Sequence, residues 1–185
     1  LLLSCLLLLS ACVAPGRTAN GAVPLWEVRS GEETVAWLAG SIHMLPASAY
    51  PLPAPLSRAF EASSRLVVEV DVTALRQREL ADLVGRLGRY SGGESLTDHL
   101  PRDTFDRLVA HARARGETEA AYLSMRPWLV MLTLSNAALL ELGHEPGYGV
   151  DLHFLRRAHA SGKPVTSLES AEYQLRLLAD ADAGV

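Results

Sequence analysis

The sequence predicts an α/β fold with a central mixed β-sheet and flanking helices. Short apolar runs of strand length, such as residues 34–39 and 65–71, are separated by longer segments whose apolar residues recur at helical spacing. The chain of 185 residues is 49% hydrophobic and 21% charged, which is typical of a globular domain with a buried core. Its formal net charge is −4 and its Lys and Arg residues are scattered, which argues against a nucleic-acid partner.

The first residues are expected to lie outside this fold. Residues 1–9 form an apolar run with the length of a signal peptide, too short to cross a bilayer comfortably. Small residues lead from this run to Cys12 in a pattern that resembles a bacterial lipobox, whose cysteine is freed by cleavage and lipidated. We therefore expect a signal peptide with a truncated start over residues 1–12, a tether over residues 13–23 and a lipid anchor in the bacterial cell envelope. The alternative is an ordinary signal peptide that contains a cysteine.

The remaining domain, residues 24–185, contains no cysteine. A disulfide framework is therefore excluded for this domain, and so is a thiolate that acts as a nucleophile or a ligand. Any metal ion in the domain must be bound by His, Asp or Glu side chains.

In chain order, the domain begins with a predicted hairpin. Residues 24–28 and 34–39 are apolar runs joined by a polar segment that contains a glycine. Residues 45–55 contain four prolines and are expected to be a loop. A further strand is expected over residues 65–71, because an almost continuous apolar run is typical of a buried strand, and a last one over residues 163–169.

Seven segments are predicted to be helical. Most carry an apolar stripe at helical spacing, and several are bounded by Gly or Pro. One of them, residues 127–142, is apolar throughout and shorter than a membrane span, so we expect a helix buried in the core. No strand follows the last helix, so the sheet is expected to be incomplete at the C-terminus. The helices are expected over residues 55–64, 74–90, 101–115, 119–125, 127–142, 150–160 and 170–178.

Polar side chains are predicted at three strand ends. His43 follows Gly40, where the second strand of the hairpin stops. Glu69 and Glu169 lie near the ends of the two later strands. Because ligands of open α/β sheets bind at strand ends, these groups can converge although they are far apart in sequence. A histidine with carboxylates suits a divalent metal ion, which lowers the pKa of a bound water. The alternative is that each group is structural, and no local pair such as His-x-x-x-His favours the metal.

Several short motifs cover most of the chain after the tether. They are Leu25-Trp26-Glu27-Val28, Leu38-Ala39-Gly40-Ser41-Ile42-His43-Met44, Pro51-Leu52-Pro53, Leu66-Val67-Val68-Glu69-Val70-Asp71, Gly149-Val150-Asp151, Gly162-Lys163-Pro164-Val165 and Leu168-Glu169-Ser170-Ala171-Glu172-Tyr173-Gln174-Leu175. In order and spacing, these motifs resemble the TraB/GumN family. That family is related to the TIKI metal-dependent proteases and, more distantly, to the erythromycin-esterase and ChaN-like proteins, so the resemblance implies their type of α/β fold.

The resemblance implies roles for five residues. Gly40 and His43 match a Gly-x-x-His motif that supplies a metal ligand. Glu69 matches an acidic strand end that acts as a ligand or as a catalytic carboxylate. Glu169 matches a further acidic position, to which we assign a catalytic role, and Asp151 belongs to the family's Gly-x-Asp motif, whose role the resemblance leaves open.

The implied function is a divalent-metal-dependent, protease-like hydrolase of the cell envelope that uses Mn²⁺, Co²⁺ or Zn²⁺ and acts on a peptide or protein. Two alternatives stay open: a non-catalytic envelope binding or assembly module with the same fold, and an esterase-like hydrolase. The family carries a second Gly-x-x-His on a late strand, whereas this sequence contains the motif only at residues 40–43. We therefore expect the C-terminal part of the family domain to be missing and only half of the metal site to be present.

Overall fold

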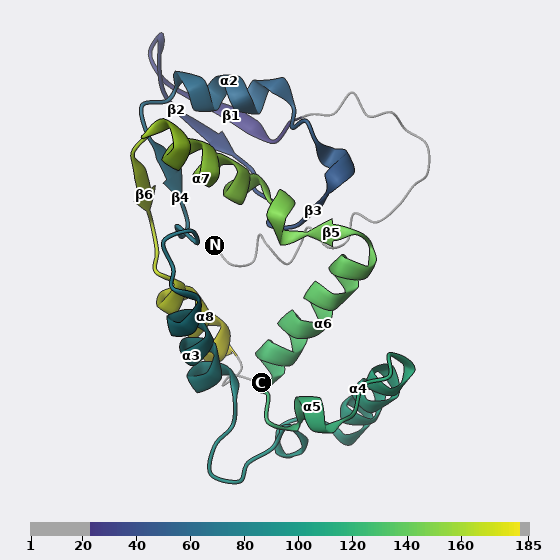
Figure 1. Cartoon of the computed structure of the whole chain (residues 1–185). Helices are drawn as coiled ribbons and strands as arrows, with labels where there is room; N and C mark the ends of the chain where they lie inside the picture. The colour runs from purple at the N-terminus through teal and green to yellow at the C-terminus, as the bar shows by residue number, and fades with distance from the viewer. Residues whose placement is uncertain (1–22, 182–185) are drawn as a thin grey trace.

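The computed structural model describes residues 23–181 and has a mixed α/β fold. Figure 1 shows that the strands gather with helices α2 (Ala54–Ala62) and α7 (Val150–Ser161) at one end, while most other helices form the opposite end. Helix α6 (Pro127–Glu141) runs between the two ends. The remaining helices are α3 (Gln77–Gly88), α4 (Arg102–Ala114), α5 (Ala120–Leu123) and α8 (Ala171–Ala181). All seven α-helices of the described residues coincide with predicted helical segments.

Strands β1 (Leu25–Ser30) and β2 (Glu33–Ala39) form the predicted antiparallel hairpin. A bulge shifts the register after Val28. Gly31 takes a left-handed φ of 62° in the connecting turn, a conformation that glycine adopts without steric cost. The hairpin is therefore determined by its local sequence, and β2 delivers the chain directly to residues 40–43.

Strands β4 (Leu66–Val68) and β6 (Val165–Ser167) lie side by side and parallel. Between them the chain passes through helices α3 to α6 and returns through α7, which contacts both strands. A backbone hydrogen bond extends the ladder past the strands, because Glu169 N donates to Glu69 O at 2.9 Å. The carboxyl ends of β4 and β6 are therefore adjacent, as expected from their apolar runs.

The predicted central mixed sheet is not formed within residues 23–181, which contain three two-stranded sheets. The strands β4 and β6 are shorter than predicted because the chain bends directly after each of them. The third sheet joins β3 (Leu45–Pro46), inside the predicted loop over residues 45–55, to β5 (His144–Glu145), which lies in no predicted strand. Such two-residue strands depend on a distant partner and have no apolar period of their own. An erythromycin-esterase-like or ChaN-like arrangement is therefore not confirmed.

Each end of the molecule has its own hydrophobic core. In the α/β end, Leu56 of α2 is buried against Val150 and Phe154 of α7, and partly buried side chains of the strands pack around them. In the helical end, the buried cluster comes from α4, α5, α6 and the turn before α4; its members are Leu96, Leu108, Ala112, Tyr122 and Val130. Helix α7 therefore anchors the end of the molecule that contains residues 40–43.

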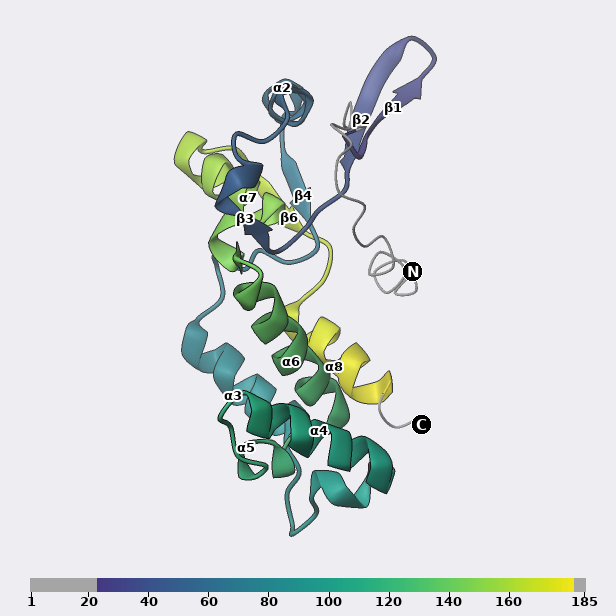
Figure 2. The ribbon, with the colours of Figure 1, turned by 90° about the vertical axis from the view of Figure 1, so that its right-hand side faces the viewer.

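Helix α6 is less buried than its sequence predicts. Trp128 and Val130 are buried near its beginning, whereas Met131 and Leu140 are exposed. The helix bridges the two ends of the molecule (Figure 2), so it is not enclosed along its whole length. The prediction of a core helix is therefore wrong for its C-terminal half. No helix in the described part of the chain has the length and hydropathy needed to span a membrane.

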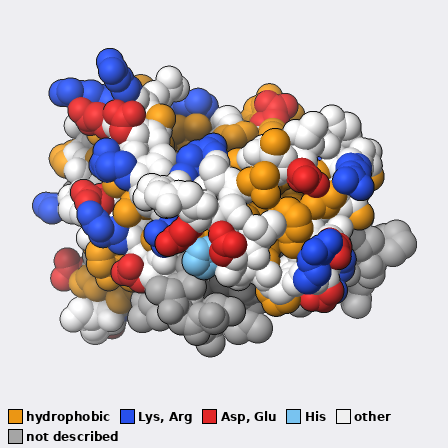
Figure 3. All heavy atoms as spheres, turned by 90° about the horizontal axis from the view of Figure 1, so that it is seen from below, with side chains coloured by type: hydrophobic (Ala, Val, Ile, Leu, Met, Phe, Trp, Pro, Cys, Tyr) orange, Lys and Arg blue, Asp and Glu red, His pale blue; other side chains and the backbone are white. Residues whose placement is uncertain are grey.

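Large hydrophobic side chains are exposed on several elements. Trp26 and Leu38 lie opposite each other on the hairpin and are 57% and 62% exposed, and Leu168 is 71% exposed. Figure 3 shows hydrophobic side chains gathered in patches on the face seen from below. Exposed apolar patches are typical of surfaces that contact another protein segment.

The buried side chain of Leu155 provides a test of this packing. Leu155 lies on α7 and has no exposed surface, so Leu155→Ala is expected to lower the free energy of unfolding by about 2–5 kcal/mol through lost burial and a cavity. Urea unfolding followed by circular dichroism measures this change. Leu142→Ala removes the same atoms from a side chain that is 71% exposed and is expected to cost less than about 0.5 kcal/mol. Equal losses in the two variants would contradict the described core.

Candidate functional site

The loop that follows β2 is held by the beginning of helix α7. Gly40 N donates a hydrogen bond to Pro24 O at 2.7 Å, which extends the pairing of the hairpin. Val150 N, at the first residue of α7, donates to Ile42 O at 2.9 Å. Because the first N–H groups of a helix have no partner inside the helix, the loop carbonyl satisfies one of them. The backbone directly before His43 is therefore fixed at two points.

Two glycines allow these segments to approach each other. A Cβ atom at Gly149 would lie 2.8 Å from Asp151 Oδ1 and 2.9 Å from the carbonyl carbon of His43, so a side chain there would force the backbone to shift. A Cβ atom at Gly40 would lie 3.0 Å from the Cβ atom of Pro24. The sequence analysis quoted both glycines in family motifs but assigned a role only to Gly40. The available signal for Gly149 was its place directly before the start of a predicted helix.

His43 and Asp151 form a hydrogen-bonded pair across this contact. His43 Nδ1 lies 2.9 Å from Asp151 Oδ2. The side chain of Asp151 is 18% exposed, whereas that of His43 is 69% exposed. Asp151 lies in the first turn of α7, where the helix dipole favours a negative charge. The imidazole is therefore held through Nδ1 while much of its ring faces solvent.

The pair shifts the pKa values of both groups. The hydrogen bond to Asp151 raises the pKa of His43 above its usual 6.5; partial burial opposes this, and the charges of Asp151 and Glu69 add to it. Burial acts to raise the pKa of Asp151, but the hydrogen bond and charge of His43, with the backbone N–H groups of Leu152 and Asp151, lower it below its usual 3.8. Both shifts favour the ionised pair.

The two predicted glutamates lie next to each other at the strand ends. Gln174 of α8 donates from Nε2 to Glu69 Oε2 at 3.2 Å, which orients one oxygen of this carboxylate. The charge of Glu69 also acts on His43, so these two side chains are close enough to interact electrostatically. Glu169 is exposed, and its side chain makes no hydrogen bond or ion pair with any residue of the described chain. The structure therefore joins His43 to Asp151, lets the charge of Glu69 act on His43, and brings the backbone of Glu169 to that of Glu69.

The donor set of this site is small. Among residues 23–181, no group of three or more His, Cys, Asp or Glu side chains is arranged to hold a metal ion. The nearby donors are one imidazole nitrogen of His43 and the carboxylate of Glu69, a mixture that suits a divalent ion of borderline softness. These residues fit part of a coordination sphere. Cys12, the predicted lipidation site, lies outside the described residues.

A second histidine–aspartate pair joins the same helix to the chain after β4. His159 Nε2 is 2.9 Å from Asp71 Oδ2, and Asp71 Oδ1 accepts a hydrogen bond from Thr73 N at 3.0 Å. The sequence analysis did not predict this pair, because it depends on the fold that brings α7 to the end of β4. It ties the helix to the chain just after Glu69.

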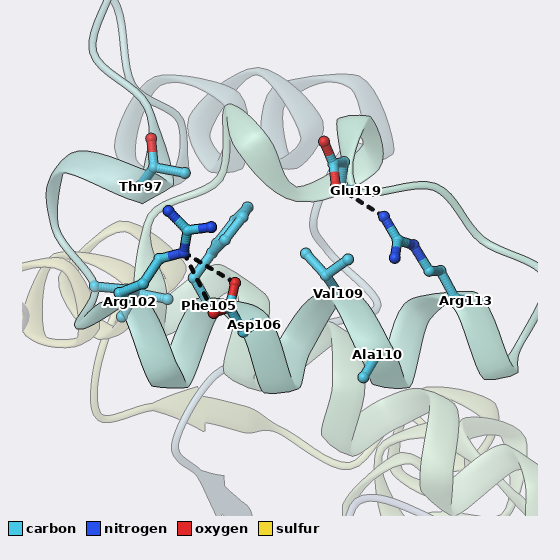
Figure 4. Close-up of a pocket in the computed structure, with 9 residues that line it drawn as sticks. Thr97, Arg102, Phe105, Asp106, Val109, Ala110, Arg113 and Glu119 are labelled. Carbon is cyan, nitrogen blue, oxygen red and sulfur yellow. Dashed lines mark hydrogen bonds and ion pairs between the residues drawn. The ribbon is translucent and has the colours of Figure 1, made fainter.

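A pocket of about 630 Å³ lies along α4, in the helical end of the molecule. Figure 4 shows Arg102 beside Asp106 and Arg113 beside Glu119, with apolar side chains between the two pairs. The arginines are already paired, at 3.0 Å and 3.7 Å from those carboxylates. None of the predicted site residues lines this pocket. Its presence therefore does not change the location of the candidate site.

A model of the TraB/PrgY/gumN family matches residues 24–184. The chain belongs to this family. Among curated proteins, the uncharacterized protein YbaP of Escherichia coli strain K12 is 28% identical to this family member over 141 residues, and YbaP of Shigella flexneri has the same identity. The aligned region is 76% of this chain and 50% of each YbaP, so the chain spans about half the length of these relatives. No solved structure matches the chain.

The shifted pKa values predict a pH dependence. Because the folded-state pKa of His43 is raised, its stabilising contribution is complete below about pH 6.5 and is lost as the pH rises through that pKa. Because the pKa of Asp151 is lowered, its contribution is present above about pH 4 and is lost as the pH falls through the folded-state pKa. The ion pair therefore stabilises the protein most between these two limits.

Asp151→Asn is expected to lower the pKa of His43 toward 6.5, because it removes the charge that favours the imidazolium. Titration of the imidazole resonances by NMR measures this. The pKa of His153 is lowered by burial, Arg157 and Arg156, and is expected to move less in the same variant. An unchanged pKa of His43 would show that the pair does not form in solution.

Proposed function

We propose that the protein is a divalent-metal-dependent hydrolase of the cell envelope that acts on a peptide or protein substrate. The observation that carries this proposal is the exposed imidazole of His43, which lies 2.9 Å from Asp151 and on which the charge of the strand-end Glu69 acts. Membership of the TraB/PrgY/gumN family supports it.

His43 and Glu69 would hold the ion. No hydrogen bond occupies His43 Nε2 within the described residues, so this nitrogen is available as a ligand. Mn²⁺, Co²⁺ and Zn²⁺ each accept a combination of imidazole and carboxylate. When bound, such an ion supplies a Lewis acid that lowers the pKa of water near neutrality. Two side chains do not complete its coordination, and we assign the remaining positions to water and to other parts of the family domain.

The two glutamates would have different tasks. One oxygen of Glu69 is oriented by Gln174, which leaves the other to bind the ion or to accept a proton from water as general base. Glu169 lies just past the neighbouring strand β6, where its N–H donates to Glu69 O, and is exposed. It would act as a second acidic group that exchanges a proton with the substrate.

A binding or assembly module is the second candidate function. The exposed side chains of Trp26, Leu38 and Leu168 favour it, because they offer apolar surface to another protein segment. A larger mixed sheet of the ChaN-like type stays part of the proposal. The proposed envelope location and the lipid anchor rest on residues 1–12 alone.

Metal binding is the first prediction of the hydrolase proposal. We expect calorimetry with Mn²⁺, Co²⁺ or Zn²⁺ to show stoichiometric binding by the purified protein. His43→Ala removes the nitrogen ligand and is expected to weaken binding by about 100-fold or more, and Glu69→Gln by about tenfold or more. His159→Ala is the matched control, because it removes another exposed histidine of an aspartate pair on α7 and is expected to bind normally.

The outcomes separate the two candidate functions. Metal binding that is lost in His43→Ala, with hydrolysis of peptides by the wild type alone, would support the hydrolase. Hydrolysis of esters instead of peptides would change the substrate class. Failure of the wild-type protein to bind any of the three ions would contradict the hydrolase and favour the binding module. Unchanged binding in His43→Ala would place the ion elsewhere.

A further inference from the structure

We propose that Asp151 is a positioning residue that keeps His43 in the tautomer protonated on Nδ1 and so leaves Nε2 free to bind a metal ion. The metal part of this inference rests on the proposed function. The tautomer part rests only on the contact between the two side chains, so the two parts can be tested separately.

The contact identifies which nitrogen carries the proton. An ionised carboxylate only accepts hydrogen bonds, so at 2.9 Å from Asp151 Oδ2 the Nδ1 atom of His43 must be the donor. When the imidazole is neutral, its single proton therefore stays on Nδ1. Nε2 then presents a lone pair, which is the form that binds a metal ion. Without the carboxylate, nothing in the described surroundings holds the proton on Nδ1.

Asp151 is rigid enough to impose this arrangement. Its side chain is largely buried in the first turn of α7, and the next turn of the helix is anchored by the buried side chains of Phe154 and Leu155. The ring of His43 is mostly exposed and makes no other hydrogen bond in the part of the chain that the structure describes. The carboxylate therefore determines the orientation of the ring, and not the reverse.

Consecutive residues of the two segments are joined in parallel. Val150 N donates a hydrogen bond to Ile42 O at 2.9 Å, and His43 Nδ1 lies 2.9 Å from Asp151 Oδ2. Gly149 lies against the carbonyl group of His43, where a Cβ atom would not fit. Residues 149–151 thus fix both the backbone and the ring of His43. This gives the Gly-x-Asp motif a physical role that the sequence left open.

The second pair on α7 shows a different arrangement. His159 meets Asp71 through Nε2, not Nδ1, and Asp71 also accepts a hydrogen bond from Thr73 in a turn. This aspartate therefore favours the opposite tautomer of its histidine. It provides a matched carboxylate for the experiment, since both aspartates contact a histidine at 2.9 Å.

The experiment is ¹⁵N NMR of the imidazole nitrogens in the metal-free protein, at a pH above the pKa of His43. We expect the wild-type spectrum to show a protonated Nδ1 and an unprotonated Nε2 for His43. Asp151→Asn keeps the size of the side chain but removes the charge, and is expected to lose this preference, as is Asp151→Ala. In Asp71→Ala the tautomer of His159 is expected to change while that of His43 stays the same.

Metal affinity provides the second measurement. Loss of a carboxylate that supports a histidine ligand typically weakens metal binding by 10–100-fold, so Asp151→Asn is expected to weaken Co²⁺ or Zn²⁺ binding by about that factor. Gly149→Ala is expected to weaken it as well, because the added methyl group pushes residues 149–151 away from His43. Circular dichroism confirms that each variant is folded, and the isosteric Asn variant serves if Asp151→Ala unfolds.

The outcomes distinguish this inference from the proposed function. A wild-type spectrum with the proton on Nε2 of His43 would overturn the inference, as would an unchanged tautomer and affinity in Asp151→Asn. If the wild-type protein shows the expected tautomer but binds no metal ion, the positioning role of Asp151 would be supported and the metal-dependent hydrolase contradicted. A changed tautomer with a 10–100-fold loss of affinity would support both.

Discussion

The contact between the first turn of α7 and the loop after β2 organises the α/β end of the molecule. It places a helix N-terminus against the carbonyl group of Ile42 and the partly buried carboxylate of Asp151 against His43. The same helix contributes Val150 and Phe154 to the hydrophobic core and contacts both strands of the parallel pair. One helix therefore links the hairpin, the strand ends and the core, and the candidate site lies where these parts meet.

Local patterns in the sequence were enough to predict the hairpin and the helices. The β1–β2 turn depends on a glycine, and most of the seven helices depend on nearby apolar spacing, with Gly or Pro at the ends of several. Pairings between distant segments were not predictable in this way. Two-residue strands such as β3 and β5 are too short to show an apolar periodicity. The exposed half of α6 is as apolar in sequence as a core helix, so its composition does not show that it lacks packing partners.

The candidate site was predictable to the extent that it lies at strand ends. His43, Glu69 and Glu169 follow apolar runs, and the parallel pairing of β4 and β6 brings the two glutamates together as expected. The side chains that hydrogen-bond to them come from helices. Within a helix, no apolar strand run ends beside such a residue, so the sequence pattern does not indicate it. Asp151 was indicated only by the family motif. Gln174 lies in another quoted motif but received no role, because its contact with Glu69 depends on the position of α8.

The site joins residues that are far apart along the chain, since His43 and Asp151 are separated by 108 positions. Closing so long a loop costs conformational entropy before any contact is gained, and such non-local contacts slow folding. Helix α3 packs against α8, which follows α7, so contacts on both sides of this closure depend on it. An intact His43–Asp151 pair therefore reports that the chain between the two residues has closed into its native arrangement.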